Sequence, residues 1–335
     1  MILWIASYPK SGNTWIRSFL SSYFCTPDGS FSFDLLKNIP TFESDIFSPY
    51  LSKEEAAKNP ESISKYWLEV QKNSRLKNGN FIFLKTHNFC GEINNHPFTS
   101  AKYTIGFIYV VRDPREVVVS YSNHFKTSFE ESVNMITSSN PAVLLNEGIN
   151  YPVFIYNWGI NYSSWKKFNN VPSITIKYED MISEPYLTFK NILKFLNNLG
   201  LPAIDEYKLS NSLKNTSFSS LQNLEKRDGF KEQHLLKDIK FFNKGSVDSW
   251  KTKLSKIRIT LPHNIYQKRL SNYMDFSFFK NNFYYVTRDI TSVLFLEKTI
   301  NDTVKKFRSS HQRSIRKAKE SGVLVRQSKD FKTFY

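Results

Sequence analysis

Three short basic segments of the chain carry side chains that could bind an anion and move a proton. Lys10 lies in the loop after the first apolar run, Lys85 and His87 belong to the sequence Lys85-Thr86-His87, and Arg112 follows another apolar run. Lysine and arginine neutralise phosphate-like groups, and arginine can do so with a two-pronged fork. A neutral histidine, whose ordinary pKa is about 6.5, can accept a proton at physiological pH. These residue types favour a site where an anion is held beside a general base.

The loop around Lys10 differs from the phosphate-binding loop of nucleotidases and kinases. Gly12 lets the backbone approach an anion, and the helix expected after it offers free N–H groups and its positive dipole end. In the nucleotidase loop a lysine directly precedes the Ser or Thr, whereas Lys10 stands four residues before Thr14. The loop therefore suits phosphate binding without metal-assisted chemistry, and we expect no metal site. A plain strand-to-helix turn is the alternative interpretation.

Short apolar runs alternate with helical patterns, and this alternation explains how the basic residues are brought together. Four buried strands are predicted at residues 2–6, 81–84, 105–111 and 173–176. Helices are predicted at residues 15–23, 52–72, 117–125, 151–168 and 187–196. This order indicates a parallel sheet covered by helices on both faces, and such sheets bind ligands beyond the carboxyl ends of their strands. Three of the four predicted strands lead into a Lys, His or Arg at that edge.

The loop sequence Ser7-Tyr8-Pro9-Lys10-Ser11-Gly12-Asn13-Thr14-Trp15 resembles the 5′-phosphosulfate-binding loop of the cytosolic-type sulfotransferases. Further motifs similar to those of that family follow in the same order. They are Lys85-Thr86-His87, the pair Arg112 and Ser120, Lys177-Tyr178-Glu179-Asp180-Met181, Thr216-Ser217-Phe218, and Lys244-Gly245 with Trp250-Lys251. The resemblance covers residues 1–278 and implies a three-layer α/β/α fold with a central parallel sheet.

The resemblance also implies a function and a role for each motif. The donor would be 3′-phosphoadenosine 5′-phosphosulfate (PAPS), with His87 as the catalytic base and with Lys10 and Lys85 stabilising the leaving phosphate. The residues expected to bind this nucleotide are Lys10, Ser11, Gly12, Asn13, Thr14, Trp15, Arg112, Ser120, Tyr178, Thr216, Phe218, Lys244 and Gly245. Two positions depart from the family pattern, because Asn243 replaces an arginine and Asp248 replaces a second glycine.

Composition sets broader limits on the chain. It has 335 residues, 40% of them hydrophobic, and a net charge of +16, which favours anionic partners. Its two cysteines exclude a disulfide scaffold. No apolar run is long enough for a membrane helix, and the first apolar run is too short for a signal peptide, so a cytoplasmic protein is expected.

Residues 279–335 differ from the rest of the chain. Residues 301–335 contain ten Lys or Arg residues against three acidic ones, and a basic helix is predicted at 302–320. The segment 314–323 resembles part of the FemAB-like acyltransferases of the GNAT type. We therefore expect a sulfotransferase domain at 1–278 and a basic C-terminal extension, a truncated GNAT-like segment to which no second activity is assigned.

Two other functions remain open from the sequence. A P-loop-type kinase or nucleotidase would require Mg²⁺, and a non-catalytic nucleotide-binding protein would show no turnover. The acceptor is a hydroxyl or amine on a small molecule, a glycan or a lipid, and the motifs do not choose among these. No nucleic-acid partner is expected, and the sequence does not indicate an oligomeric state.

Overall fold

The computed structural model describes residues 1–73, 81–138, 143–144, 151–230, 240–242, 245, 247 and 249–254. Its contacts divide the chain into two units, 1–262 and 263–335, and every described residue belongs to the first. The expectations for Asn243, Lys244, Asp248 and the extension 279–335 lie outside the described residues. The same holds for the predicted boundary at residue 278.

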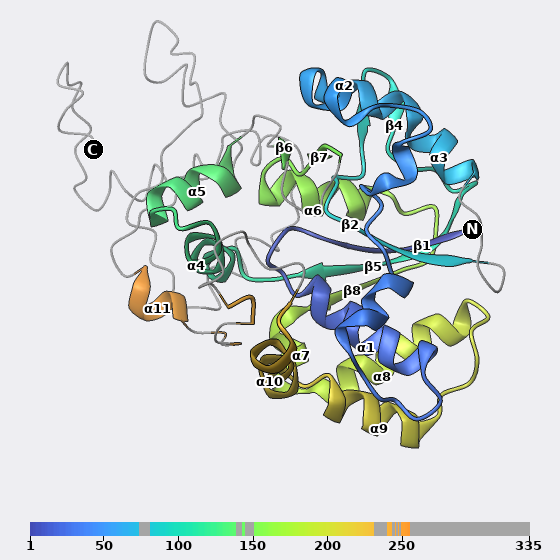
Figure 1. The fold of residues 1–335 in the computed structure, drawn as a ribbon, viewed down its shortest axis with the longest axis vertical. Helices are drawn as coiled ribbons and strands as arrows, with labels where there is room; N and C mark the ends of the chain where they lie inside the picture. Colours follow the sequence, from blue (N-terminus) through green and yellow to red (C-terminus); the bar gives the residue numbers. More distant parts are fainter. Residues whose placement is uncertain are drawn as a thin grey trace, which may run out of the picture. The chain divides into compact units, whose positions relative to one another are not determined.

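A four-stranded parallel sheet lies at the centre of the described unit (Figure 1). Its strands are β1 (Ile2–Ser7), β2 (Ile82–Thr86), β5 (Thr104–Val111) and β8 (Ser173–Lys177), in the order β2-β1-β5-β8. In the register of the sheet, Ala6 of β1 lies opposite both Thr86 and Tyr109. The four predicted strands and their parallel arrangement are confirmed, so the carboxyl ends of β1, β2 and β5 share one edge.

Alternate side chains of β1 enter two different hydrophobic cores, which makes the fold three-layered. Leu3 and Ile5 belong to the core on one face of the sheet, together with α1, α7 and α8. Trp4 and Ala6 belong to the core on the other face, together with α3 and α6. Both sets are almost fully buried, as expected for a strand that is covered on both faces. The predicted three-layer α/β/α fold is confirmed.

The helices and short elements have the following bounds. The main helices are α1 (Asn13–Cys25), α4 (Pro114–Phe125), α5 (Phe129–Thr137), α6 (Trp158–Lys167), α7 (Tyr178–Ser183), α8 (Pro185–Asn198), α9 (Glu206–Asn215), α10 (Phe218–Asp228) and α11 (Ser249–Lys253). The 3₁₀ turns are η1 (Phe33–Asn38) and η2 (Asp45–Phe47). Two small hairpins are formed by β3 (Glu92–Ile93) with β4 (His96–Pro97), and by β6 (Val143–Leu144) with β7 (Val153–Phe154).

Two predicted helices are wrong in extent. The helix expected at 52–72 is divided into α2 (Lys53–Lys58), η3 (Pro60–Tyr66) and α3 (Trp67–Asn73). The break follows from Pro60, which has no N–H to continue α2 and disfavours helical backbone at the residue before it. The helix expected at 151–168 begins only at Trp158, where the Asn157 side chain accepts a hydrogen bond from the Ile160 N–H.

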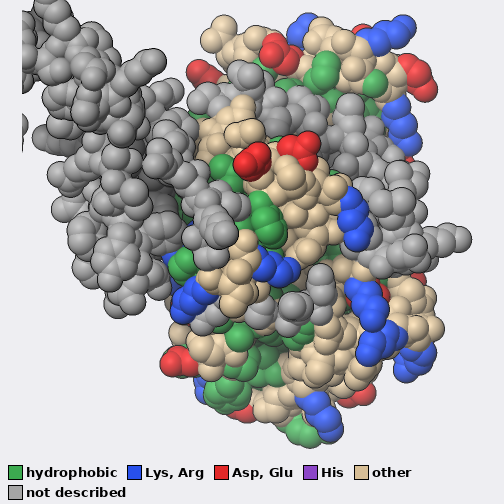
Figure 2. Space-filling model, turned by 90° about the vertical axis from the view of Figure 1, so that its left-hand side faces the viewer, with side chains coloured by type: hydrophobic (Ala, Val, Ile, Leu, Met, Phe, Trp, Pro, Cys, Tyr) green, Lys and Arg blue, Asp and Glu red, His purple; other side chains and the backbone are tan. Residues whose placement is uncertain are grey.

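The surface of the described part carries mixed charge. On the face drawn in Figure 2, Lys and Arg side chains lie among acidic and hydrophobic ones rather than in one continuous basic strip. No helix among the described residues is long and apolar enough to span a bilayer.

Candidate active site

The loop between β1 and α1 contains several buried polar atoms. Gly12 precedes α1 with φ of +102°, and no side chain caps this end of the helix. The Asn13 amide donates to the Ile5 carbonyl at 3.0 Å and to Ser7 Oγ at 3.2 Å, which fixes the loop against its own strand. Among the described residues, Ser11 Oγ and Asn13 Oδ1 are buried and find no hydrogen-bond partner. Because buried polar atoms are nearly always paired, these two atoms are candidates for contact with a polar ligand.

Tyr178 closes the loop from the first residue of α7. A Cβ atom added at Gly12 would lie 2.6 Å from Cδ2 of the Tyr178 ring, so only glycine fits there. Arg112 also contacts this ring, with its guanidinium 4.1 Å from the ring centroid. Burial raises the pKa of the Tyr178 hydroxyl, so it stays neutral. Gly12, Tyr178 and Arg112 thus form one packed stack, with the loop at one end and a cationic fork at the other.

Arg112 is held on two edges of its guanidinium. Nη1 donates to the Lys10 carbonyl at 3.0 Å, and Nη2 donates to Glu116 Oε2 at 3.3 Å. Ser120 lies two turns further along α4 and is half-buried. Asp113, between the strand and the helix, caps α4 through the Arg115 N–H, and its own N–H donates to Glu179. The structure therefore brings Arg112 to the loop, and it uses Asp113 and Glu179 for orientation.

His87 follows β2 and is directed by the end of β1. Its Nδ1 atom lies 2.8 Å from the Ser7 carbonyl oxygen. A carbonyl can only accept, so Nδ1 carries the hydrogen and the lone pair is on Nε2. Among the described residues, none forms a hydrogen bond to Nε2. The pKa of His87 is well below its ordinary value, first because the ring is desolvated and then because Lys85, Arg17 and Lys10 carry positive charge nearby. The ring is consequently neutral, with an available basic nitrogen.

The two predicted catalytic lysines lie near this histidine. Lys85 is buried at the end of β2, and its charge acts on both His87 and Glu43. Lys10 adopts a left-handed backbone conformation with φ of +65°, which non-glycine residues rarely adopt. Its ammonium lies 4.2 Å from the centroid of the Phe241 ring. Both lysines therefore contribute positive charge to the edge of the sheet where His87 and the loop meet.

Aromatic side chains adjoin the loop on its other side. The Trp15 ring lies 6.1 Å from that of Tyr178 and 6.4 Å from that of Phe218. A Cβ atom added at Gly245 would lie 2.7 Å from the Phe218 ring, which brings the late glycine to the same cluster. Thr216 is different, because its hydroxyl donates to the Ser212 carbonyl at 2.7 Å within the preceding helix. Trp15, Tyr178, Phe218 and Gly245 are thus gathered, whereas Thr216 supports the end of α9.

Sequence reasoning missed three buried charged residues around the site. Arg17 donates to the carbonyls of Ile39 and Leu36, and so holds the segment after η1 against α1. Glu116 binds Arg112 on one side and the Ser249 hydroxyl and Trp250 N–H on the other. Its spacing of four residues from Arg112, which lies just before α4, is a signal that could have found it. Glu43 and Arg17 stand in segments without a comparable pattern.

Among the described residues, no group of three or more His, Cys, Asp or Glu side chains is arranged to hold a metal ion. What the geometry offers is a loop for a phosphate-like anion, an arginine fork, aromatic walls and a neutral histidine. These elements suit transfer of an anionic group from a nucleotide to an acceptor that gives up a proton.

Comparisons with known proteins point in the same direction. The family model described as "Sulfotransferase domain" matches residues 2–274. The flavonol 3-sulfotransferase of Flaveria bidentis is 26% identical over 256 residues, which cover 74% of this chain and 75% of that protein. Sulfotransferase 2A6 of Mus musculus is 26% identical over 280 residues, or 79% and 83% of the two chains. A solved structure of a mouse sulfotransferase complexed with PAP aligns over 95% of this chain and 88% of that chain, at 16% identity and a TM-score of 0.49.

Proposed function

Because the chain belongs to the sulfotransferase domain family, we propose that it moves a sulfuryl group from PAPS to an acceptor hydroxyl or amine by in-line displacement. PAPS-dependent sulfuryl transfer is the activity of the family, and the roles of individual residues are our proposal. The observation that carries it is the hydrogen bond from His87 Nδ1 to the Ser7 carbonyl. That bond leaves Nε2 basic beside a loop with unpaired buried polar atoms.

The loop residues fit the phosphosulfate end of the donor. Ser11 Oγ can donate a hydrogen bond to an anionic oxygen, and the uncapped amino end of α1 adds its N–H groups and dipole. Gly12 keeps the backbone free of a Cβ at this point. Lys10, Asn13 and Thr14 complete this part of the proposed site. The bound donor would supply the activated sulfuryl group.

The other half of the nucleotide has a separate set of proposed contacts. Arg112, with Ser120 and the late pair Lys244-Gly245, would hold the 3′-phosphate, since a guanidinium fork matches phosphate oxygens. Trp15, Tyr178 and Phe218 would supply apolar walls for adenine, for which base–aromatic stacking contributes about 1–3 kcal/mol per base. Thr216 would act through the end of α9.

In the transfer step, the protein would mainly position the reactants and stabilise the charge that develops. Lys10 and Lys85 would stabilise the negative charge that develops on the leaving phosphate. His87 Nε2 would take the proton of the acceptor, and general-base assistance of this kind typically contributes about 10²–10⁴-fold. The hydrogen bond from Nδ1 to Ser7 then stabilises the ring in the orientation that this step requires.

The acceptor is proposed to be a small molecule with a hydroxyl group. Relatives in Flaveria bidentis and Photinus pyralis are named for flavonol and luciferin, and the candidate site is lined by aromatic side chains. The alternative acceptor is a hydroxyl group on a glycan or a lipid, and an acceptor screen would distinguish it from a small molecule. Relatives in Arabidopsis thaliana are named cytosolic sulfotransferases, which supports a cytoplasmic location for this chain.

The first test is donor binding without metal. We expect 3′-phosphoadenosine 5′-phosphate to bind with micromolar affinity in calorimetry, ATP to bind more weakly, and Arg112→Ala to lose the preference. Binding of ATP in preference, with dependence on Mg²⁺, would instead indicate a kinase or nucleotidase.

The second test separates an enzyme from a nucleotide-binding protein. Turnover of PAPS with a panel of phenols, sterols and sugars should fall about 10²–10⁴-fold in His87→Ala. The matched control is His96→Ala, which removes a histidine from the β3–β4 hairpin. If the bisphosphate binds but no acceptor is sulfated, the enzymatic proposal is refuted for that panel and a binding role is supported.

A further inference from the structure

A buried carboxylate contacts the residues that flank the proposed catalytic base, and the proposed reaction gives it no role. Glu43 is 1% exposed and lies between η1 and η2. The backbone beside it runs along the end of β2, because the Phe42 N–H donates to the Lys85 carbonyl at 2.8 Å and the Lys85 N–H donates to the Pro40 carbonyl at 2.9 Å. Glu43 is therefore fixed against the strand that delivers Lys85 and His87.

The Glu43 carboxylate binds the residues on both sides of His87. The Thr86 hydroxyl donates to Oε1 at 2.6 Å, and the Asn88 amide donates to the same oxygen at 2.5 Å. The other oxygen accepts from the Thr41 hydroxyl at 3.1 Å. A buried carboxylate that accepts hydrogen bonds from the residues before and after His87 restrains the backbone between them.

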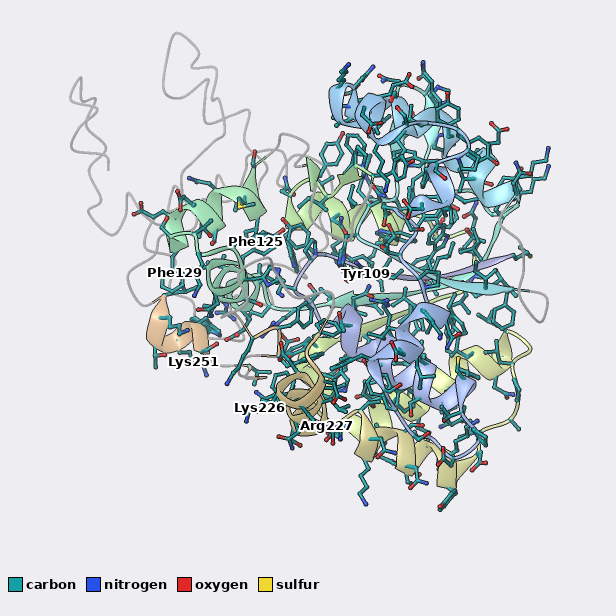
Figure 3. The ribbon with its side chains drawn as sticks, viewed as in Figure 1. Tyr109, Phe125, Phe129, Lys226, Arg227 and Lys251 are labelled. Atoms are coloured by element: carbon teal, nitrogen blue, oxygen red, sulfur yellow. The ribbon has the colours of Figure 1, made fainter. Side chains whose placement is uncertain are left out.

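The same turn is held from the opposite side by α6. The Asn161 amide donates to the His87 carbonyl at 3.0 Å, and its oxygen accepts from the Tyr109 hydroxyl at 2.9 Å. Tyr109 lies on β5 near the middle of the sheet, as Figure 3 shows. The Asn88 oxygen accepts in turn from the Phe154 N–H at 2.7 Å. Within the described part of the chain, hydrogen bonds hold His87 by one ring atom, Nδ1, so the orientation of the ring depends on the backbone that these contacts fix.

Glu43 suits this role when it is ionised. Burial raises the pKa of its carboxyl, while the hydrogen bond from Thr86 and the charge of Lys85 act in the opposite direction. All three hydrogen-bonded side chains donate to it, and an acceptor for three donors matches a carboxylate. Its charge also balances that of Lys85, which is buried beside it.

We propose that Glu43 is a positioning residue of the sulfuryl transfer, which holds Thr86 and Asn88 so that His87 keeps its Nδ1–H on Ser7 and its Nε2 toward the acceptor. The proposal rests on the function proposed above. It assigns Glu43 no contact with donor or acceptor, so its removal should affect the chemical step and leave donor binding intact.

The kinetic test compares Glu43→Gln with Thr41→Val. Glu43→Gln keeps the shape of the side chain but replaces the charged carboxylate, which accepts from Asn88 and Thr86, by a neutral amide with a single acceptor oxygen. We expect kcat to fall about 10- to 100-fold, as for a misplaced catalytic group. The dissociation constant of 3′-phosphoadenosine 5′-phosphate should change less than about twofold. Thr41→Val removes the hydrogen bond that does not adjoin His87 and should leave kcat within about twofold of the original enzyme. An unchanged kcat in Glu43→Gln, or a parallel loss of nucleotide affinity, overturns the proposal.

A spectroscopic test does not require turnover. In ¹⁵N-histidine NMR spectra, His87 should show the Nδ1–H tautomer, assigned by comparison with His87→Gln. In Glu43→Gln this signature should weaken in favour of Nε2–H, and in Thr41→Val it should persist. If Glu43→Gln does not fold, Thr86→Val replaces it, since this variant keeps the volume and removes one bond to Glu43. If the folded variant keeps the Nδ1–H tautomer of His87, the positioning role of Glu43 is refuted. If the variant loses this tautomer but no acceptor is sulfated by the original chain, the positioning role is supported and only the proposed function is refuted.

Discussion

Replacing Gly12 by alanine tests whether the donor loop, Tyr178 and Arg112 act as one packed unit. The new methyl group would meet two obstacles. The backbone has φ of +102°, which costs an alanine roughly 1–2 kcal/mol relative to glycine. The Cβ atom would also lie 2.6 Å from Cδ2 of Tyr178, closer than carbon atoms approach without displacement.

The second obstacle is expected to reach the nucleotide site. The Tyr178 ring is 5% exposed and has the Arg112 guanidinium on its face at 4.1 Å, so the ring cannot move without moving the arginine or the loop. We therefore expect 3′-phosphoadenosine 5′-phosphate to bind at least about tenfold more weakly to Gly12→Ala, equivalent to about 1.4 kcal/mol. The strain should also lower Tm by about 2–4 °C per kcal/mol.

The matched control is Gly200→Ala. Gly200 follows α8 with φ of +95°, but an added Cβ would have no atom within 4 Å. This variant carries the backbone strain alone, so Tm should fall while the calorimetric affinity stays within about twofold. Equal affinities of Gly12→Ala and the original chain would refute the packed-unit reasoning. An equal loss in Gly200→Ala would show that general destabilisation, not the loop, weakens binding.

Three further predictions follow from the charges at the site. Because the pKa of His87 is well below 6.5 and its neutral ring is the proposed base, kcat/KM should fall only as pH drops through that lowered value. An acid limb at 6.5 or above contradicts this. Glu116→Gln should destabilise the chain by about 3 kcal/mol in urea unfolding, because it breaks a buried pair with Arg112, whereas Ser249→Ala should cost about 1 kcal/mol. Asn243→Arg should tighten binding of the bisphosphate about tenfold in calorimetry, since it restores a charged contact of the family pattern.

The sheet was predictable because each strand is a short apolar run, and burial on both faces demands that pattern. Leu3 and Trp4 are adjacent in the sequence yet enter opposite cores, so hydrophobicity without alternation was the correct signal. The helix boundaries were less predictable. Pro60 interrupts an otherwise amphipathic stretch, and the segment before Asn157 pairs with β6 in a short hairpin, a contact that helical periodicity does not encode.

The candidate site residues at strand ends and in motifs could be predicted from the sequence. The residues that hold them in place from distant segments could not. Arg112 and His87 could be predicted as candidates, because the carboxyl edge of a parallel sheet is where ligands bind. Glu43 is 44 residues before His87 and reaches it only because its segment lies along β2. Nothing in the sequence around Glu43 indicates that pairing, since two backbone hydrogen bonds to Lys85 create it.

The cations around His87 have two effects that act in opposite directions during the proposed reaction. Lys10 and Lys85 favour negative charge on a leaving phosphate, and the same charges disfavour a proton on the imidazole. Before the donor binds, this keeps the base neutral. A bound anionic donor would offset part of that positive charge, so the proton affinity of Nε2 would rise when a proton has to be accepted. The charge of the donor therefore links the proton affinity of His87 to the positive charge of Lys10 and Lys85.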